Sequence, residues 1–318
     1  MSKTPALTAS ALSKSYHLKG TFLKSKKEVV ALNNISFTLR EGQSLGILSE
    51  SGAGKSTLAK ILVGAESADS GLLLIDGNDV TQVDIPTRLR KHRKVRMVYQ
   101  NPYSSLNPRL TIFDILDEPL RNNTNLNQAE RAERIKEVLL QVGLRGEHAL
   151  RLPNMFSAGE RQRIAIARAL ILEPVCIVAD EPLTALDISV RSQILNLMIE
   201  LQEKLGIAFI IISYSLTILR HMCDQILVLC KGEMVEYGPT ENVLGDPKHP
   251  YTQDLLAQRS LSFSEQEDET SNCCIYADRC QFAIDQCRTE KPLQRPVSER
   301  IVCCFRADEA ALNNSSDL

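Results

Sequence analysis

The stretch that decides the fold is SESGAGKST, residues 49–57. It follows EGQSLGILS (41–49), which predicts a strand, and it runs into KSTLAKILVG (55–64), which predicts a helix. A glycine-rich turn between a strand and a helix can cradle phosphate groups, because backbone N–H groups and the helix N-terminus converge on one anion. We therefore expect a phosphate-binding loop on an α/β sheet.

Within this loop, Gly52 and Gly54 let N–H groups point inward around a β-phosphate. Lys55 is expected to reach the β- and γ-phosphates, and the Ser56 hydroxyl to hold Mg²⁺. The usual pattern starts with glycine, where this chain has Ser49, at a cost of about 1 kcal/mol if φ is positive there. The expected nucleotide-binding set is Ser49, Glu50, Ser51, Gly52, Ala53, Gly54, Lys55, Ser56 and Thr57.

A second element, VCIVADEP (175–182), ends an apolar strand in two acids. Asp180 is expected in the Mg²⁺ shell and Glu181 beside an attacking water. A strand followed by Asp-Glu is a weak signal alone, but together with the loop it predicts a nucleotide-hydrolysing site.

Composition excludes several other classes of protein. The 318 residues carry 37 Lys plus Arg against 39 Asp plus Glu, so the net charge is −2, which argues against nucleic-acid binding through a broad basic surface. The longest apolar run, 207–212, is far shorter than the roughly 18 to 20 residues of a membrane helix. The N-terminus lacks the apolar core of a signal peptide, so we expect a cytosolic chain.

The order of segments predicts a large α/β domain and a small C-terminal extension. Apolar runs at 95–100, 175–180 and 208–213 predict strands of a mainly parallel sheet, and 225–238 predicts a hairpin turning at Lys231-Gly232. Between the first two of these runs the pattern is mostly helical. The predicted domains are 1–259 with a helical subdomain at roughly 104–172, a polar, acidic linker at 260–272, and a Cys-rich extension at 273–318.

The nine cysteines divide into two groups. Cys176, Cys223 and Cys230 have apolar neighbours and are expected in the core. The other six lie in the extension, where Cys274, Cys280, Cys287 and Cys304 have the spacing C-x5-C-x6-C-x16-C. Clustered cysteines in a cytosolic chain favour a metal site over disulfides, and four thiolates can hold zinc or an iron–sulfur cluster. Residues alone leave the metal open, and the neighbours Cys273 and Cys303 could substitute as ligands.

Four further stretches carry a family resemblance. MFSAGERQRIAIARAL (155–170) resembles the L-S-G-G-Q signature of ABC transporter ATPases. The stretches at 99–120, 182–198 and 246–256 resemble the peptide-permease branch, the dipeptide-permease members most closely. The resemblance covers nearly the whole chain except its start and 260–272. It implies an ABC-type P-loop ATPase domain, with a mainly parallel core sheet, an antiparallel β subdomain and a helical subdomain.

The resemblance implies roles for further residues. Tyr16 matches the aromatic residue that stacks on adenine, and Gln100 the glutamine that senses Mg²⁺ and the membrane partner. Ser157 and Gly159 match signature residues that complete the partner subunit's ATP site, and Asp187 matches the D-loop at the subunit interface. Asp180 and Glu181 match the Walker B aspartate and the catalytic base.

The resemblance also implies an assembly and a cofactor. A motor subunit for import of dipeptides or short peptides is expected at the cytoplasmic face of the inner membrane. Its partners would be a second ATPase subunit in a heterodimer, two membrane-spanning permease subunits and, indirectly, an extracytoplasmic peptide-binding protein. In this branch the extension implies a 4Fe–4S cluster on Cys274, Cys280, Cys287 and Cys304.

Three substitutions relative to the family pattern leave different interpretations of the function open. Tyr214 stands where the family has a switch histidine, and Ala158 and Glu160 stand where Gly and Gln are usual. Loss of one preorganised catalytic donor costs roughly two to three orders of magnitude in rate. One hypothesis is a working ATPase site with tolerated substitutions. The other is a nucleotide-binding regulatory subunit whose own site is impaired within an asymmetric heterodimer. A different transported solute is a further alternative.

Overall fold

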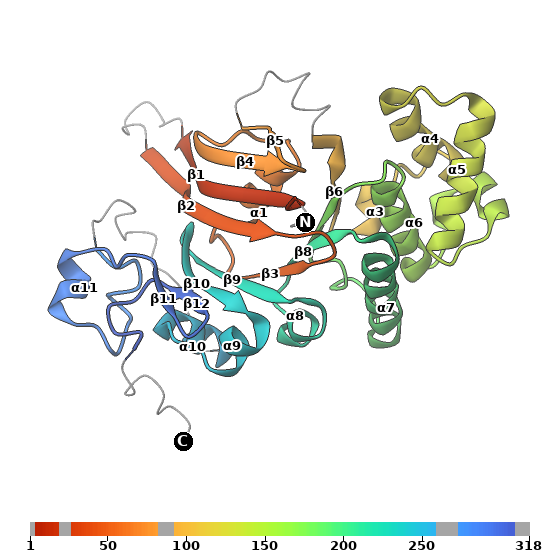
Figure 1. Cartoon of the computed structure of the whole chain (residues 1–318). Coiled ribbons are helices and arrows are strands. Elements are labelled where there is room, and N and C mark those ends of the chain that lie inside the picture. The colour runs from red at the N-terminus through yellow and green to blue at the C-terminus, as the bar shows by residue number, and fades with distance from the viewer. Residues whose placement is uncertain (1–3, 19–26, 82–91, 259–272, 309–318) are drawn as a thin grey trace.

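The computed structural model describes residues 4–18, 27–81, 92–258 and 273–308. The predicted linker at 260–272 lies outside the described residues. Figure 1 shows a central sheet with a helical region at one end and the C-terminal extension at the other.

The centre of the sheet is parallel, as the apolar runs predicted. β6 (Val95–Val98), β7 (Cys176–Asp180), β8 (Ala208–Ile212) and β3 (Ser44–Leu48) lie side by side in that order. β3 and β8 are buried at every position, which is typical of strands covered on both faces. α1 (Lys55–Leu62) starts directly after the glycine-rich turn, and α7 (Ile188–Leu205) follows β7.

The antiparallel part of the sheet continues on the side of β3 that faces away from β8. β9 (Gln225–Cys230) pairs parallel with β3 and antiparallel with β10 (Glu233–Pro239), which confirms the predicted hairpin. β10 leads through β2 (Lys27–Leu39) and β1 (Leu7–Leu18) to β4 (Ser70–Ile75) and β5 (Asn78–Asp79). The sequence did not predict β1, β4 and β5, whose residues are more polar than those of the core strands.

The helical region lies between β6 and β7 in the sequence. It contains α3 (Pro102–Ser105), α4 (Ile112–Asn123), α5 (Gln128–Gln141) and α6 (Ala158–Leu170). Thr111, Asn127 and Ser157 each form a capping box at the start of α4, α5 and α6, so the sequence sets where these helices begin. Short 3₁₀ segments lie at His92–Lys94, Gly146–Leu150 and Pro153–Met155.

The C-terminal part packs on β10. α8 (Leu216–Met222) lies between β8 and β9 in the sequence. α9 (Thr240–Gly245) and α10 (Pro250–Leu256) follow β10, and the extension adds α11 (Asp285–Thr289), β11 (Arg295–Val297) and β12 (Arg300–Val302). β12 pairs antiparallel with β10, so the extension continues the same sheet. Arg300 is buried and its guanidinium donates to the Asn242 carbonyl at 2.7 Å and pairs with Glu236. These bonds fix the extension to the large α/β domain.

Among the described helices, none combines the length and the apolar composition that crossing a bilayer requires.

Candidate functional site: a phosphate-binding loop at the carboxyl edge of the sheet

The predicted phosphate loop connects the end of β3 to the start of α1. Gly52 and Gly54 have φ of 80° and 99°, which only glycine adopts without strain. A Cβ on Gly54 would also lie 2.3 Å from the Ala31 carbonyl oxygen. Ser51, Gly52 and Ser56 are exposed, so the concave side of the loop is open to a ligand.

Ser49 replaces the usual first glycine without the strain that a positive φ would bring. It is absent from the residues with positive φ, and its side chain is fully buried. The Lys55 ammonium donates to Ser49 Oγ at 2.8 Å, to the Ser49 carbonyl at 3.2 Å and to the Glu50 carbonyl at 2.5 Å. The serine hydroxyl therefore supplies a bond to the lysine that glycine could not.

The acids predicted at the end of β7 lie beside this loop. Burial raises the pKa of Asp180, the neighbouring Glu181 raises it further, and Lys55 lowers it. Lys55 is therefore close enough to act on the Asp180 carboxylate. A divalent cation would stabilise the same charged form.

Glu181 is held by two donors. Its Oε1 accepts from the Tyr214 backbone N–H at 2.8 Å, and its Oε2 accepts from the Thr184 hydroxyl at 2.5 Å. Glu181 is 8% exposed and adopts φ of 46°, a left-handed conformation that is uncommon outside glycine. The strained backbone and two donors keep one carboxylate in one place, as a general base requires. The sequence did not predict the role of Thr184.

Tyr214, which replaces the expected histidine, lies against the loop lysine. The Lys55 Nζ lies 4.4 Å from the centroid of the Tyr214 ring, a cation–π contact. The Tyr214 side chain is 51% exposed, so its outer face is open. Its backbone N–H still holds Glu181, which means that the substitution leaves the positioning of the carboxylate intact.

Strand register gathers these segments at one edge. Ile212 pairs with both Ile47 and Asp180, and Ala179 pairs with Val98. Because these strands are parallel, the residues that follow them lie at the same edge of the sheet. Gln100, two residues beyond β6, is exposed at this edge. Its role stays a prediction.

Tyr16 lies on β1 in the antiparallel part, half-buried, with the Lys14 ammonium 5.5 Å from its ring centroid. Its stacking on adenine also stays a prediction.

The signature segment starts α6. Glu160 Oε2 accepts from the Ser157 hydroxyl at 2.8 Å and from the Ser157 N–H at 2.9 Å. These bonds lower the pKa of Glu160, so the residue that replaces the usual glutamine brings a carboxylate to the helix start. A Cβ on Gly159 would lie 2.6 Å from Val190 Cγ1 on α7, which explains why this position needs glycine. Ser157 and Asp187, at the starts of α6 and α7, are both exposed.

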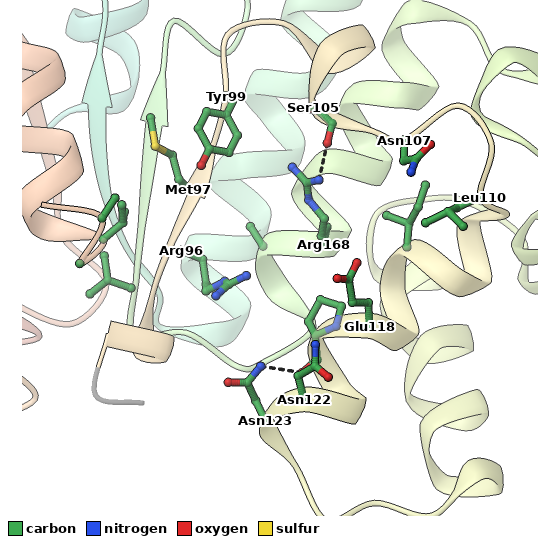
Figure 2. Close-up of a pocket in the computed structure, with 17 residues that line it drawn as sticks. Arg96, Met97, Tyr99, Ser105, Asn107, Leu110, Glu118, Asn122, Asn123 and Arg168 are labelled. Carbon is green, nitrogen blue, oxygen red and sulfur yellow. Dashed lines mark hydrogen bonds between the residues drawn. The ribbon is translucent and has the colours of Figure 1, made fainter. Parts of the chain in front are cut away.

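A cavity of about 590 Å³ lies between β6, α1 and α4, and Figure 2 shows its lining. Its charged residues are Arg96, Arg168 and Glu118. Burial lowers the pKa of both arginines, and their mutual repulsion lowers that of Arg168 further. Arg168 donates to the Ser105 carbonyl, whereas Arg96 forms no hydrogen bond or ion pair within the described part of the chain. Two arginines against one glutamate make the cavity positive.

Four cysteines of the extension lie near one another. Burial raises the pKa of the Cys274, Cys280 and Cys304 thiols, and neighbouring thiols of this group raise it further, with Cys287 acting on all three. The Cys274 N–H donates to the Cys287 carbonyl at 2.9 Å. Among the residues described, however, no three His, Cys, Asp or Glu side chains form a group arranged to hold a metal ion. The core cysteines behave as predicted, with burial raising the pKa of Cys176 to about 12.

Comparison with known proteins identifies the class. A family profile described as "ABC transporter" matches residues 32–184, and one described as "Oligopeptide/dipeptide transporter, C-terminal region" matches 235–287. The dimeric post-hydrolysis structure of the ATP-binding cassette MJ0796 bound to ADP and Pi superposes with a TM-score of 0.64 at 27% identity, covering 74% of this chain and 98% of that one. The fold and site are those of an ABC-type ATPase.

Two curated relatives narrow the class. The chain is 40% identical to the dipeptide transport ATP-binding protein DppF of Haemophilus influenzae, over 96% of this chain and 98% of that protein. It is 46% identical to the putrescine export system ATP-binding protein SapF of Escherichia coli K12, over 77% of this chain and 90% of that one. The chain belongs to the family of ABC transporter ATP-binding proteins, in the branch with the oligopeptide/dipeptide transporter C-terminal region.

Proposed function

We propose that this chain is the ATP-hydrolysing motor subunit of an importer for dipeptides or short peptides. The observation that carries the proposal is the Glu181 carboxylate, held at 2.8 Å by the Tyr214 N–H at the edge where Lys55 and Asp180 lie. With ATP on 49–57, Lys55 binds the phosphates, Ser56, Asp180 and Gln100 bind Mg²⁺, and Glu181 orients the attacking water.

The transported solute does not contact this chain, so its identity rests on the relatives named for dipeptide transport. The test is ATP-driven uptake by the purified transporter in vesicles, with its binding protein on the outer side. A labelled dipeptide should accumulate with the wild-type chain and not with Lys55→Ala. Putrescine transport in place of dipeptide uptake would instead favour the function named for SapF.

A second ATPase subunit would cover the exposed apolar residues near the signature and D-loop. Met155 is 63% exposed and Ile188 81%, and both flank segments that bind ATP across the dimer in this family. Ser157 and Gly159 would then complete the partner's ATP site. We further propose that the partner is a different chain, and that the assembly is peripheral at the cytoplasmic face of the inner membrane.

The positive cavity beside Gln100 is the proposed docking site for a cytoplasmic helix of a permease subunit. The cavity opens between α4 and the core, next to residues 101–110 (Figure 2). A shift of the helical region would be transmitted to the permease subunit at this point. Its excess of one arginine favours an acidic side chain from that helix.

Cys274, Cys280, Cys287 and Cys304 would hold a 4Fe–4S cluster. Four neighbouring thiols supply the number of ligands that such a cluster requires. Its contribution would be structural. An anaerobically purified chain should be brown with absorbance near 400 nm, and Cys280→Ser should lose most of it, whereas Cys223→Ser should not. A colourless preparation with bound zinc would refute this part of the proposal.

The second candidate, a regulatory subunit with an impaired site, is favoured by the Tyr214 ring lying over Lys55. The fixed placement of Glu181 opposes it, because the backbone bond that holds the carboxylate does not need histidine.

A further inference from the structure

The C-terminal segment reaches the back of the phosphate loop through one tyrosine. The Glu50 N–H donates to the Tyr251 phenolic oxygen at 3.3 Å, although the two residues are 201 positions apart. Tyr251 is fully buried, at the start of α10. The acceptor of the Glu50 N–H is therefore a residue of α10 and not of the loop itself.

Tyr251 is itself held by a tyrosine of the extension. The rings of Tyr251 and Tyr276 meet edge to face with 5.3 Å between centroids and an interplanar angle of 70°. Tyr276 is 2% exposed and its hydroxyl donates to the Asp254 carboxylate, so its ring has little freedom. Such an edge-to-face pair contributes about 0.5–1.5 kcal/mol beyond the burial of its area.

An electrostatic interaction also links the phosphate loop and the extension. Burial raises the pKa of Glu50, and the Arg279 guanidinium of the extension and Lys55 both oppose that shift. Arg279 therefore lies near the loop carboxylate. The extension therefore acts on the loop directly through the Arg279 charge and indirectly through the Tyr276 ring, which packs against the tyrosine that bonds to Glu50.

We propose that Tyr251, supported by Tyr276, is a positioning residue for ATP binding, and that the Cys-rich extension thereby sets the ATP affinity of the 49–57 loop. Deleting the Tyr251 hydroxyl leaves the Glu50 N–H without its acceptor, which destabilises the start of the loop. The loop must then be ordered by the nucleotide, and that cost weakens binding. The inference rests on the proposed function in requiring that ATP binds 49–57 and is hydrolysed there.

The test measures ATP dependence at this site alone. The assembled transporter carries a P-loop lysine-to-alanine change in its second ATPase subunit, and MgATP turnover is followed against ATP concentration. Tyr251→Phe should raise KM about 3- to 10-fold and change kcat less than about twofold. Tyr276→Leu should raise KM in the same direction, because it removes the ring that supports Tyr251.

Tyr237→Phe is the matched control. Its hydroxyl, on β10, donates to Gln225 Oε1 on the neighbouring strand at 2.5 Å and to the Thr38 carbonyl at 3.4 Å, and neither acceptor belongs to the 49–57 loop. It should lower the melting temperature as Tyr251→Phe does and leave KM unchanged. The proposal is overturned if Tyr251→Phe lowers the melting temperature like the control without raising KM, or if kcat falls while KM stays constant. Turnover at this site in the wild-type chain, and its loss with Lys55→Ala, tests the proposed function first. Where that turnover is present, the KM of Tyr251→Phe tests the inference alone, so the two failures are distinguishable.

Discussion

The Lys55 ammonium lies 4.4 Å from the centre of the Tyr214 ring, while the Tyr214 backbone N–H holds Glu181. One residue therefore contacts both the phosphate-binding lysine and the proposed catalytic base. Its backbone N–H performs a task that any residue except proline could perform, whereas its side chain decides what contacts the γ-phosphate. Two substitutions at 214 separate these roles.

Tyr214→His should raise turnover at this site about tenfold, because imidazole can offer the γ-phosphate a donor that the phenol does not place. Turnover is measured in the transporter whose partner subunit carries a catalytic Glu-to-Gln change, so that only the ATP site of this chain contributes to the measured rate. Tyr214→Phe keeps the ring over Lys55 and should stay within about twofold of wild type. A fall in rate with histidine would mean that the tyrosine is itself part of the catalytic arrangement.

Ser49→Ala tests the hydroxyl that replaces the usual glycine. It removes one of three bonds to the Lys55 ammonium but leaves both carbonyl acceptors and the backbone unchanged. Urea unfolding of the purified chain should show a loss of about 1 kcal/mol, with ATP affinity within about threefold of wild type. An affinity loss of a hundredfold would show that Ser49 acts on the nucleotide.

Buried His249 should make stability fall in acid. Burial lowers its pKa from 6.5 to about 3, so between these values the unfolded chain binds a proton that the folded chain excludes. Lowering the pH from 7 to 5 should cost about 2 kcal/mol through this residue.

The control is His249→Asn, which can still accept the Tyr251 N–H that His249 Nδ1 accepts at 3.0 Å. Glu236, whose carboxylate accepts the His249 N–H, titrates in both proteins and cancels in the comparison. Equal pH slopes for the wild type and the variant would contradict the assignment.

Arg96→Glu tests the positive cavity. Reversal of this charge should reduce permease-stimulated ATPase activity about tenfold and leave ATP affinity unchanged, because the cavity lies apart from the loop. Arg145→Glu is the control charge reversal, at an exposed arginine of the helical region that does not line the cavity. If both variants behave alike, general charge and not the cavity governs docking.

Much of the core and of the loop could be predicted from the sequence, because short-range patterns encode them. The glycines at 52 and 54 and the apolar strands need only their neighbours to show what they form. Thr184, Tyr251 and Tyr276 could not be found in this way. Their partners are set by tertiary packing, in the case of Tyr251 by a residue 201 positions away. The strands β1 and β4 were missed because mixed polarity hides a strand that has one solvated face.

The most direct test of the central claim is ATP turnover by the assembled transporter with Glu181→Gln in this chain only. Glutamine keeps an oxygen for the Tyr214 N–H and removes the base, so the site should bind ATP but not hydrolyse it. The account predicts that turnover collapses by about a hundredfold or more. Turnover that barely changes would contradict it, because hydrolysis would then belong to the partner and this chain would be a regulatory nucleotide-binding subunit.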